Sequence, residues 1–255
     1  MALRLYTFAI SHFAEKARWA LDHKGVDYIE RVLLPGSHFV VVRRMAPETT
    51  VPVFRDGATV IQGSSQIIDY VDAKWPKTPL TPEAIGNRTN ALELEQWLDV
   101  EFGKTLRRVL YFHVLANRRL VTGLFTQRGP WWGRAFYGAL FPFVRIGIRQ
   151  MYAIEPDNAA RDKQRIDAGL ERIDQLLDGK RYLVGDTFSR ADLTLAALAA
   201  PLVGPAENSM RWPSLEEYPP EVVALRERFS RSRAHEHVLR MYREHRVGPA
   251  STRPH

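Results

Sequence analysis

A single hydroxyl group stands where the first predicted strand gives way to a helix. Residues 3–8 alternate as a strand does, and Ser11 directly precedes the helical pattern of residues 12–24. A ligand that carries a free thiol has a thiol pKa of ~8.5. The thiol therefore needs hydrogen-bond donors and a helix N-terminus to exist as a thiolate at neutral pH. The Ser11 hydroxyl could be such a donor. The alternative is that Ser11 only caps the helix.

A second hydroxyl, that of Ser64, begins the helical pattern of residues 64–73. The free backbone amides of a helix N-terminus favour a bound anion, and a serine adds its own hydroxyl. Ser64 is therefore a candidate contact for a carboxylate group.

The composition limits the chemistry that these groups can serve. The chain has 255 residues, of which 45% are apolar and 25% charged, as expected for one large or two ordinary globular domains. It has no cysteine, which excludes disulfides, thiolate metal sites, cysteine nucleophiles and reduction through a mixed disulfide. The strand pattern begins by residue 3 with no apolar signal-peptide region before it, so we expect a cytoplasmic protein.

The net charge of +7 comes from 36 Lys and Arg residues against 29 Asp and Glu residues. Such an excess could attract nucleic acid, an anionic membrane or anionic small molecules. The charge is spread along the chain, without zinc-finger spacing or an RNA-binding signature. We therefore expect a solvated basic surface and no nucleic acid partner.

The pattern of the chain changes once, near residue 75. Before this residue, strands and helices are both predicted. The strands are expected at 3–8, 28–33, 51–55 and 58–61, and the helices at 12–24 and 64–73. Three prolines within residues 75–82 then mark a linker. The sequence predicts a βαβ-ββα domain at 1–75, a linker at 76–85, an all-helical domain at 86–246 and a tail at 247–255.

Two signals define the helical part. Apolar residues on one face predict a long helix, namely Ala91, Leu94, Leu98, Phe102, Val109 and Phe112. A capping box, Ser189-x-x-Asp192, predicts that a buried helix begins at Arg190.

In their order and spacing, these motifs resemble those of the glutathione S-transferase superfamily over nearly the whole chain. Three motifs carry the resemblance: Ser11-x-x-x-x-x-Ala17-Arg18, then Val51-Pro52 with Ser64-x-x-Ile67-x-x-Tyr70, then Gly185-Asp186-x-x-Ser189-x-x-Asp192. The resemblance implies a thioredoxin-like N-terminal domain, a C-terminal helical bundle and a homodimer. It leaves the class within the superfamily open.

The resemblance gives Ser11 the role of donating a hydrogen bond to the glutathione sulfur. Other classes use a tyrosine near the end of the first strand, but that position falls on Thr7 here, and we interpret Tyr6 as a packed strand residue. His12 stands where many relatives carry proline. Its imidazole could accept a proton or line the substrate pocket, but we favour a solvent-exposed position on the helix.

The second motif would bind glutathione. Pro52 is expected to be cis, so that the backbone of Val51 holds the cysteinyl unit, and a trans proline in a plain turn is the alternative. Ser64 would cap its helix and take the γ-glutamyl carboxylate. Relatives usually carry an acid or an amide at the position of Gly63, where it contacts the amino group of the ligand. Gln62 could make that contact instead.

The glycyl carboxylate of glutathione has no obvious partner, because Thr50 stands where relatives often carry lysine or glutamine. Arg43, Arg44 and His38 are the nearby candidates for that charge, and a solvated basic edge is the alternative. These departures bear on the affinity for glutathione more than on the fold.

Residues 131–152 contain seven aromatic residues and three arginines without an acidic residue. They predict a helix kinked at Pro142. One interpretation is an amphipathic segment on a membrane surface, since the arginines argue against a membrane span. We favour a helix that lines an apolar substrate pocket, in which Tyr111, Trp131 and Tyr137 contact the substrate. We therefore expect no membrane association.

The sequence thus predicts a serine-type glutathione S-transferase that adds the glutathione thiolate to an apolar electrophile, a reaction typical of detoxification. Glutathione would be the co-substrate, and no metal is expected. Two alternatives stay open. One is a weakly active or non-catalytic ligand carrier, and the other is a membrane-associated interaction protein that uses residues 131–152.

Overall fold

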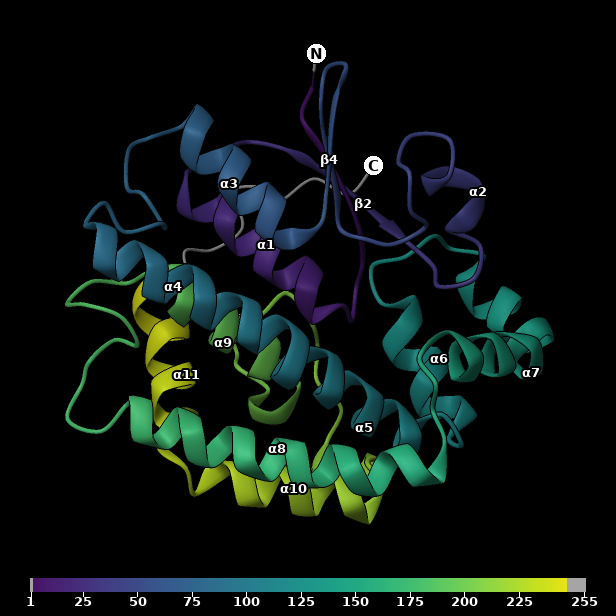
Figure 1. The fold of residues 1–255 in the computed structure, drawn as a ribbon. Coiled ribbons are helices and arrows are strands. Elements are labelled where there is room, and N and C mark those ends of the chain that lie inside the picture. Colours follow the sequence, from purple (N-terminus) through teal and green to yellow (C-terminus); the bar gives the residue numbers. More distant parts are fainter. Residues whose placement is uncertain (1, 247–255) are drawn as a thin grey trace.

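The N-terminal part of the chain forms a four-stranded sheet of order β2-β1-β3-β4 in the computed structural model, which describes residues 2–246 (Figure 1). Strand β1 (Arg4–Phe8) pairs in parallel with β2 (Ile29–Leu33) and antiparallel with β3 (Val53–Asp56), which forms a hairpin with β4 (Thr59–Gln62). The crossover between the parallel strands is α1 (His12–His23), and the short helix α2 (Phe39–Val42) follows β2. This order confirms the predicted βαβ-ββα arrangement.

Helix α1 lies between the sheet and the helical part of the molecule. It packs against α3 (Ser64–Lys74) and against α9 (Arg190–Val203), which is buried along nearly its whole length. Trp19 of α1 is fully buried. Packing on both sides therefore fixes α1, and with it the position of Ser11 at its N-terminus.

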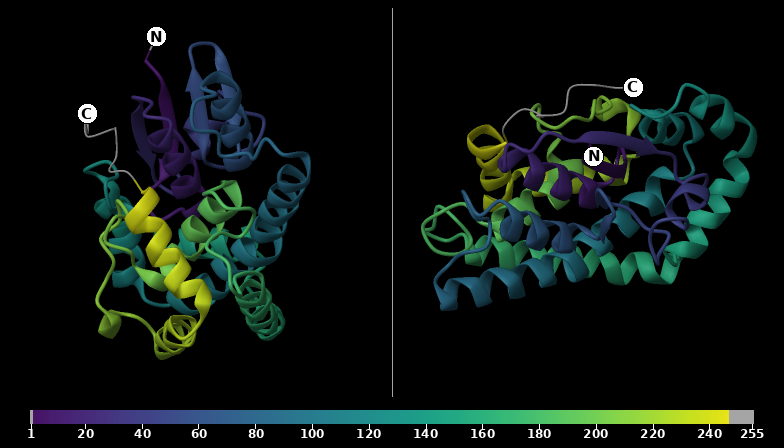
Figure 2. Two further views of the ribbon diagram at one scale, coloured as in Figure 1. Left: turned by 90° about the vertical axis from the view of Figure 1, so that its left-hand side faces the viewer. Right: turned by 90° about the horizontal axis from the view of Figure 1, so that it is seen from above.

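The rest of the chain is helical and surrounds α9 (Figures 1 and 2). Its helices are α4 (Ile85–Trp97), α5 (Lys104–Val114), α6 (Arg118–Thr126), α7 (Gly133–Met151), α8 (Pro156–Leu176), α10 (Pro220–Ser230) and α11 (Arg233–His245), and a 3₁₀ turn covers Leu215–Glu217. The predicted linker 76–85 falls between α3 and α4. The predicted tail 247–255 lies outside the described residues.

The predicted long helix is interrupted by a π-helical turn, Leu98–Gly103, between α4 and α5. The turn carries Asp99, whose carboxylate accepts hydrogen bonds from Lys16 Nζ at 2.7 Å and from Ser65 Oγ at 2.9 Å. π-Helical turns often mark functional sites. This one brings an acid of the helical part to the N-terminus of α3.

A buried ionic network joins the two parts next to that turn. Arg190 contacts Glu95 at 2.5 Å and Asp69 at 2.6 Å, and Lys16 contacts Glu95 at 2.7 Å. Burial alone would raise the pKa of Glu95, but Lys16 and Arg190 together lower it. The carboxylate therefore stays charged and holds α1 and α9 to α4.

The predicted capping box is confirmed. Asp192 accepts hydrogen bonds from Ser189 N at 3.1 Å and Ser189 Oγ at 2.9 Å, and α9 begins at Arg190. Asp192 also accepts one from Leu183 N at 2.8 Å. One buried carboxylate thus fixes both the start of α9 and the loop before it.

Helix α7 continues through Pro142 and is tied to α6 by an arginine. Proline has no N–H, so the carbonyl oxygen of Gly138, four residues earlier, loses its usual helical donor. Arg118 of α6 donates to that oxygen instead. The two helices therefore form one unit at the edge of the molecule (Figure 1).

Candidate functional site

Three segments meet at one end of the sheet. Tyr6 of β1 lies opposite Val53 of β3, and Val53 lies opposite Gln62 of β4. Gly63 N donates a hydrogen bond to Pro52 O at 3.0 Å. The turn after β1, the loop before β3 and the N-terminus of α3 are thus neighbours, as the two sequence motifs of this part require.

Ser11 is the N-cap residue of α1, and its Oγ accepts a hydrogen bond from Ala14 N at 3.2 Å. The side chain is half-buried. A hydroxyl that accepts one bond keeps its proton free to donate another. The cap and the proposed thiolate donor are therefore compatible roles of one oxygen, rather than alternatives.

The peptide bond between Val51 and Pro52 is cis, as predicted. The prediction that Ser64 caps α3 was wrong, because the N-cap residue is Gly63 and Ser64 is the first residue of the helix. Gly63 has a φ of 99°, and a Cβ there would lie 2.2 Å from Gln66 Oε1. Only glycine fits this bend, which gives the departure at position 63 a structural cause.

Ser64 itself is buried at the helix N-terminus, where the free backbone amides favour an anion. Its neighbour Ser65 has a different role, since the Ser65 hydroxyl bonds to Lys16 and Asp99. Ser65 is therefore tied into the structure, and Ser64 remains the candidate for the anion contact.

The Gln62 side chain is engaged with the loop before Val51. Its Nε2 donates to the carbonyl oxygens of Glu48 at 2.8 Å and Thr50 at 2.9 Å, and its Oε1 accepts from Glu48 N at 3.2 Å. The side chain is fully used in holding the loop before Val51. A contact between Gln62 and the ligand stays a prediction, and it would compete with these bonds.

Of the three cationic candidates, His38 is unavailable. It is buried, its Nδ1 accepts from Gly36 N at 3.1 Å, and its Nε2 lies 2.8 Å from Thr49 O. Burial lowers the pKa of His38, so the ring is neutral at pH 7. Arg43 and Arg44 are exposed after α2.

The comparisons with known proteins agree with this geometry. Residues 5–79 match the family model of the glutathione S-transferase N-terminal domain, and residues 140–232 match that of the C-terminal domain. The chain belongs to the glutathione S-transferase superfamily.

Individual relatives are distant. Glutathione S-transferase TCHQD of Arabidopsis thaliana is 27% identical over 208 residues, which are 78% of this chain and 77% of that protein. β-Etherase LigF of Sphingobium sp. strain SYK-6 has a TM-score of 0.62 at 19% identity over 94% of this chain and 99% of that one. A glutathione-bound theta class transferase of Xanthomonas axonopodis pv. citri has a TM-score of 0.57 at 20% identity, over 93% and 97%. At these identities the two structures show the fold alone.

The prediction that His12 is exposed on the helix of this transferase was wrong, because His12 is buried. Its Nε2 has no hydrogen-bond partner among the described residues. Burial and the nearby Arg107 guanidinium lower the pKa of His12 to about 3. The imidazole is therefore neutral at working pH and too weak a base to take up a proton there.

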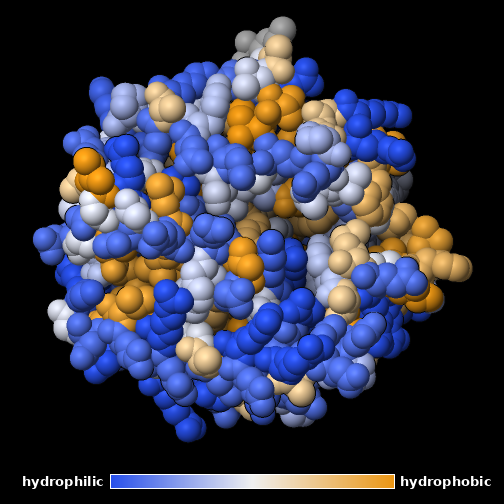
Figure 3. All heavy atoms as spheres, viewed as in Figure 1, coloured by the Kyte–Doolittle hydropathy of each residue, from blue (hydrophilic) through white to orange (hydrophobic). Residues whose placement is uncertain are grey.

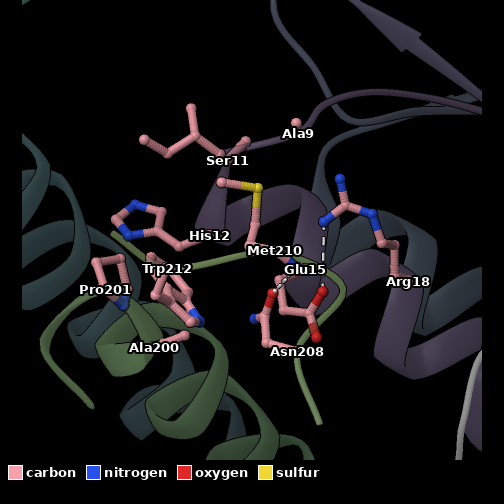
Figure 4. Close-up of a pocket in the computed structure, with 11 residues that line it drawn as sticks. Ala9, Ser11, His12, Glu15, Arg18, Ala200, Pro201, Asn208, Met210 and Trp212 are labelled. Atoms are coloured by element: carbon pink, nitrogen blue, oxygen red, sulfur yellow. Dashed lines mark hydrogen bonds and ion pairs between the residues drawn. The ribbon is translucent and has the colours of Figure 1, made fainter. Parts of the chain in front are cut away.

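A small cavity lies between the start of α1 and the segment that follows α9 (Figure 4). Ser11 and His12 line one side, and Pro201, Met210 and Trp212 line the other. The wall opposite Ser11 is thus largely apolar. These C-terminal residues could not be predicted to lie here, because only the fold brings them to α1.

Arg107 of α5 is the functional candidate that the sequence analysis missed. Its guanidinium lies 4.1 Å from the ring centre of Tyr152 and 5.6 Å from that of Phe13. Its buried Nε has no hydrogen-bond partner, and no acid among the described residues pairs with it. A half-buried guanidinium without a counter-charge stands next to His12.

Of the three predicted pocket residues of the helical part, only Tyr111 lies near Arg107, through its contact with Tyr152. Tyr137 is fully buried and donates to Pro35 O at 2.8 Å, and Trp131 is 93% exposed. Tyr111 packs between Phe125 and Tyr152. Tyr137 and Trp131 therefore do not line a substrate pocket, and α7 does not have the role that the sequence interpretation gave it.

Proposed function

We propose that this protein adds the glutathione thiolate to an electrophilic small molecule. The observation that carries the proposal is the Ser11 hydroxyl, which caps α1 and keeps a proton free at the helix N-terminus. Family membership and the names of the relatives support glutathione transferase activity. The proposal also includes the cytoplasmic location expected from the N-terminal sequence, and the homodimer and the role in detoxification that the family resemblance implies.

In the proposed complex, glutathione lies along the cis Val51-Pro52 bond with its γ-glutamyl carboxylate at Ser64. The amides at the start of α3 and the Ser64 hydroxyl stabilise that charge. Arg43 is the exposed cation that we assign to the glycyl carboxylate.

Replacement of Ser64 by alanine should weaken glutathione binding about 10- to 100-fold. The reason is the loss of one hydrogen bond to a charged group, roughly 1.5–3 kcal/mol. Isothermal titration calorimetry measures the effect. Ser65→Ala is the matched control, because its hydroxyl bonds to Lys16 and Asp99 and should not be needed by the ligand. Equal affinities of both variants would contradict the assignment.

We propose further that the electrophile is an apolar molecule with an anionic substituent. Phe13 and Tyr152, whose rings lie next to the Arg107 guanidinium, would contact the apolar part, and Arg107 would pair with a carboxylate. Arg107 supports this because it is half-buried beside His12 without an acidic partner. A buried cation without a counter-charge is costly unless a ligand neutralises it.

Arg107→Met should lower kcat/KM for a carboxylate-bearing acceptor about 10- to 100-fold, mainly by raising KM, because one charge-assisted hydrogen bond is lost. An uncharged acceptor of similar size should be converted as well as before. Arg119→Met, at an exposed position of α6, is the control for general loss of charge. Equal losses with both acceptors would indicate that Arg107 only supports the fold.

A non-catalytic ligand carrier is the second candidate function. The observation that favours it is that Gly63 and Gln62 leave the amino group of glutathione without the contact usual in the family. Calorimetry on the unmutated protein decides between the two, since a carrier would not bind glutathione at millimolar concentration.

A further inference from the structure

Helix α7 has apolar side chains on two sides. Tyr137, Phe141 and Ile148 face inward and are buried, whereas Leu140, Phe143 and Ile146 are exposed, Phe143 by 71%. Trp131, just before the helix, is 93% exposed, and Met151 at its end is 50% exposed. Apart from arginines, the exposed positions of this helix include only one polar residue, Gln150. We call the exposed side chains of Trp131, Leu140, Phe143, Ile146 and Met151 the outer face of α7.

The outer face forms an edge of the molecule. Figures 1 and 2 show α7 at the periphery, next to α6 and away from α11, and Figure 3 shows apolar side chains gathered where it protrudes. Water-exposed large apolar side chains cluster here, and such clusters mark interaction surfaces. No helix of residues 2–246 is long and apolar enough to cross a membrane.

The charged side chains of α7 all have one sign. At 100° per residue, Arg134, Arg145 and Arg149 fall within about 60° of one another, along one flank of the outer face. Residues 102–154 contain nine Lys and Arg residues and no Asp or Glu. The whole α5–α7 stretch therefore offers cations next to the apolar face without acids of its own.

The helix is held rigidly in this position. Arg118 donates to Gly138 O, Tyr137 donates to Pro35 O, and Leu34 packs within 3.0 Å of the Cβ position of Gly133. The inner side of α7 is thus in contact with the rest of the molecule, and the outer face cannot turn inward without breaking these contacts. Its exposure is a property of the fold.

A second copy of the chain does not fit this face. In a two-fold symmetric dimer the same surface meets itself, which would bring the three arginines of each copy together without an acid to neutralise them. An anionic lipid surface supplies both missing partners, since its headgroups pair with the arginines and its acyl chains take up the apolar side chains.

We propose that α7 docks this protein on the surface of membranes that contain anionic lipid. The helix lies in the interface plane, with Phe143 and Ile146 inserted, the arginines at the phosphates, and Trp131 at the headgroup level where aromatic residues gather. The attachment is peripheral and reversible.

The test is co-sedimentation of the full chain with vesicles of phosphatidylcholine, alone or with about one third phosphatidylglycerol. We expect binding to the anionic vesicles only, weakened as salt rises to about 0.5 M, where charges are strongly screened. Arg145→Gln with Arg149→Gln should weaken it about 25-fold, or about fivefold for each charge. Phe143→Ser with Ile146→Ser should weaken it at least about tenfold.

Matched controls come from exposed residues elsewhere. Ile85→Ser removes an exposed apolar side chain from α4, and Arg231→Gln with Arg243→Gln removes two exposed charges from the region of α10 and α11. Both should bind vesicles as the unmutated chain does. A blue shift of tryptophan emission on binding that is lost in Trp131→Phe would place this end of α7 in the lipid.

Absence of vesicle binding would overturn the proposal, and so would equal binding to both lipid compositions. Binding that the α7 variants keep, or that the control variants lose equally, would do the same. Melting curves of all variants establish that they are folded. Because the α7 variants change no residue that we assign to glutathione or to the electrophile, they should keep their activity in solution, so this test is independent of the proposed function.

Discussion

Replacement of Ser11 by alanine should lower kcat/KM for conjugation at neutral pH about 10²- to 10³-fold. The range is that found when one preorganised donor to a developing or bound anion is removed. Without the donor, the pKa of bound glutathione rises toward that of a free thiol. The loss should therefore be largest at low pH and shrink as the pH passes the raised pKa. A thiolate absorbance titration and a pH-rate profile measure both effects.

The capping role of Ser11 predicts a separate and smaller effect. Loss of the bond from Ala14 N should cost about 1 kcal/mol of unfolding free energy, or roughly 2–4 °C in Tm. Ser11→Thr keeps both the cap and the donor, so it should retain most activity. Ser11→Asp keeps the cap but brings a negative charge and no proton, so it should be stable and inactive.

Unchanged rates and an unchanged thiolate titration in Ser11→Ala would reduce Ser11 to a cap. The neighbouring groups could not easily replace it. Thr7 is buried and donates to Glu30 at 2.6 Å, and Tyr6 packs in the core next to Val53. His12, with a pKa of about 3, is a poor base. The chain would then be better described as a ligand carrier.

Local signals in the sequence predict the N-terminal part well. Proline at position 52 acts on its immediate neighbours, and so does the capping box at Ser189 in the helical part, so their consequences can be deduced without the fold. Gly63 shows the limit of this reasoning. Its replacement of an acid or amide could be noticed in the sequence, but its cause, the positive φ against Gln66, depends on how α3 leaves β4.

Residues whose role depends on distant contacts could not be found in advance. Arg107 looks like one of several arginines in the sequence, and only the packing of α5 against Phe13 and Tyr152 leaves it without an acid. His12 is buried because the segment after α9 covers α1. For the same reason the π-helical turn at Asp99 was invisible, since its register depends on Lys16.

Helix α7 shows a different limit, that of periodicity. A helix with apolar residues on two sides has no single hydrophobic face, so the pattern cannot tell which side is buried. The aromatic residues of this pattern are equally compatible with a substrate pocket and with an exposed face. The structure buries Tyr137 and exposes Trp131 and Phe143. The absence of acids from residues 102–154 was the signal that could have indicated a surface role.

Replacement of Asp192 by alanine should cause the largest loss of stability, about 3–5 kcal/mol, or roughly 10 °C in Tm. The Asp192 carboxylate is fully buried and accepts hydrogen bonds from Leu183 N, Ser189 N and Ser189 Oγ. Its removal leaves two buried backbone N–H groups unpaired, each at a cost of about 1–3 kcal/mol, and opens a cavity beside them. Thermal and urea unfolding measure the difference.

One variant separates the hydrogen bonds of Asp192 from its charge, and a second serves as a control. Asp192→Asn keeps one acceptor but turns an amide N–H₂ toward the remaining donors, so its loss should be intermediate. Asp186→Ala removes an exposed acid from the same motif and should leave Tm nearly unchanged. A Tm for Asp192→Ala within about 2 °C of the unmutated protein would mean that the loop and the start of α9 find other partners. Because α9 packs on α1 and supplies Pro201 to the cavity beside Ser11, a loosened start of α9 should also weaken glutathione binding as the temperature rises, well before the molecule unfolds.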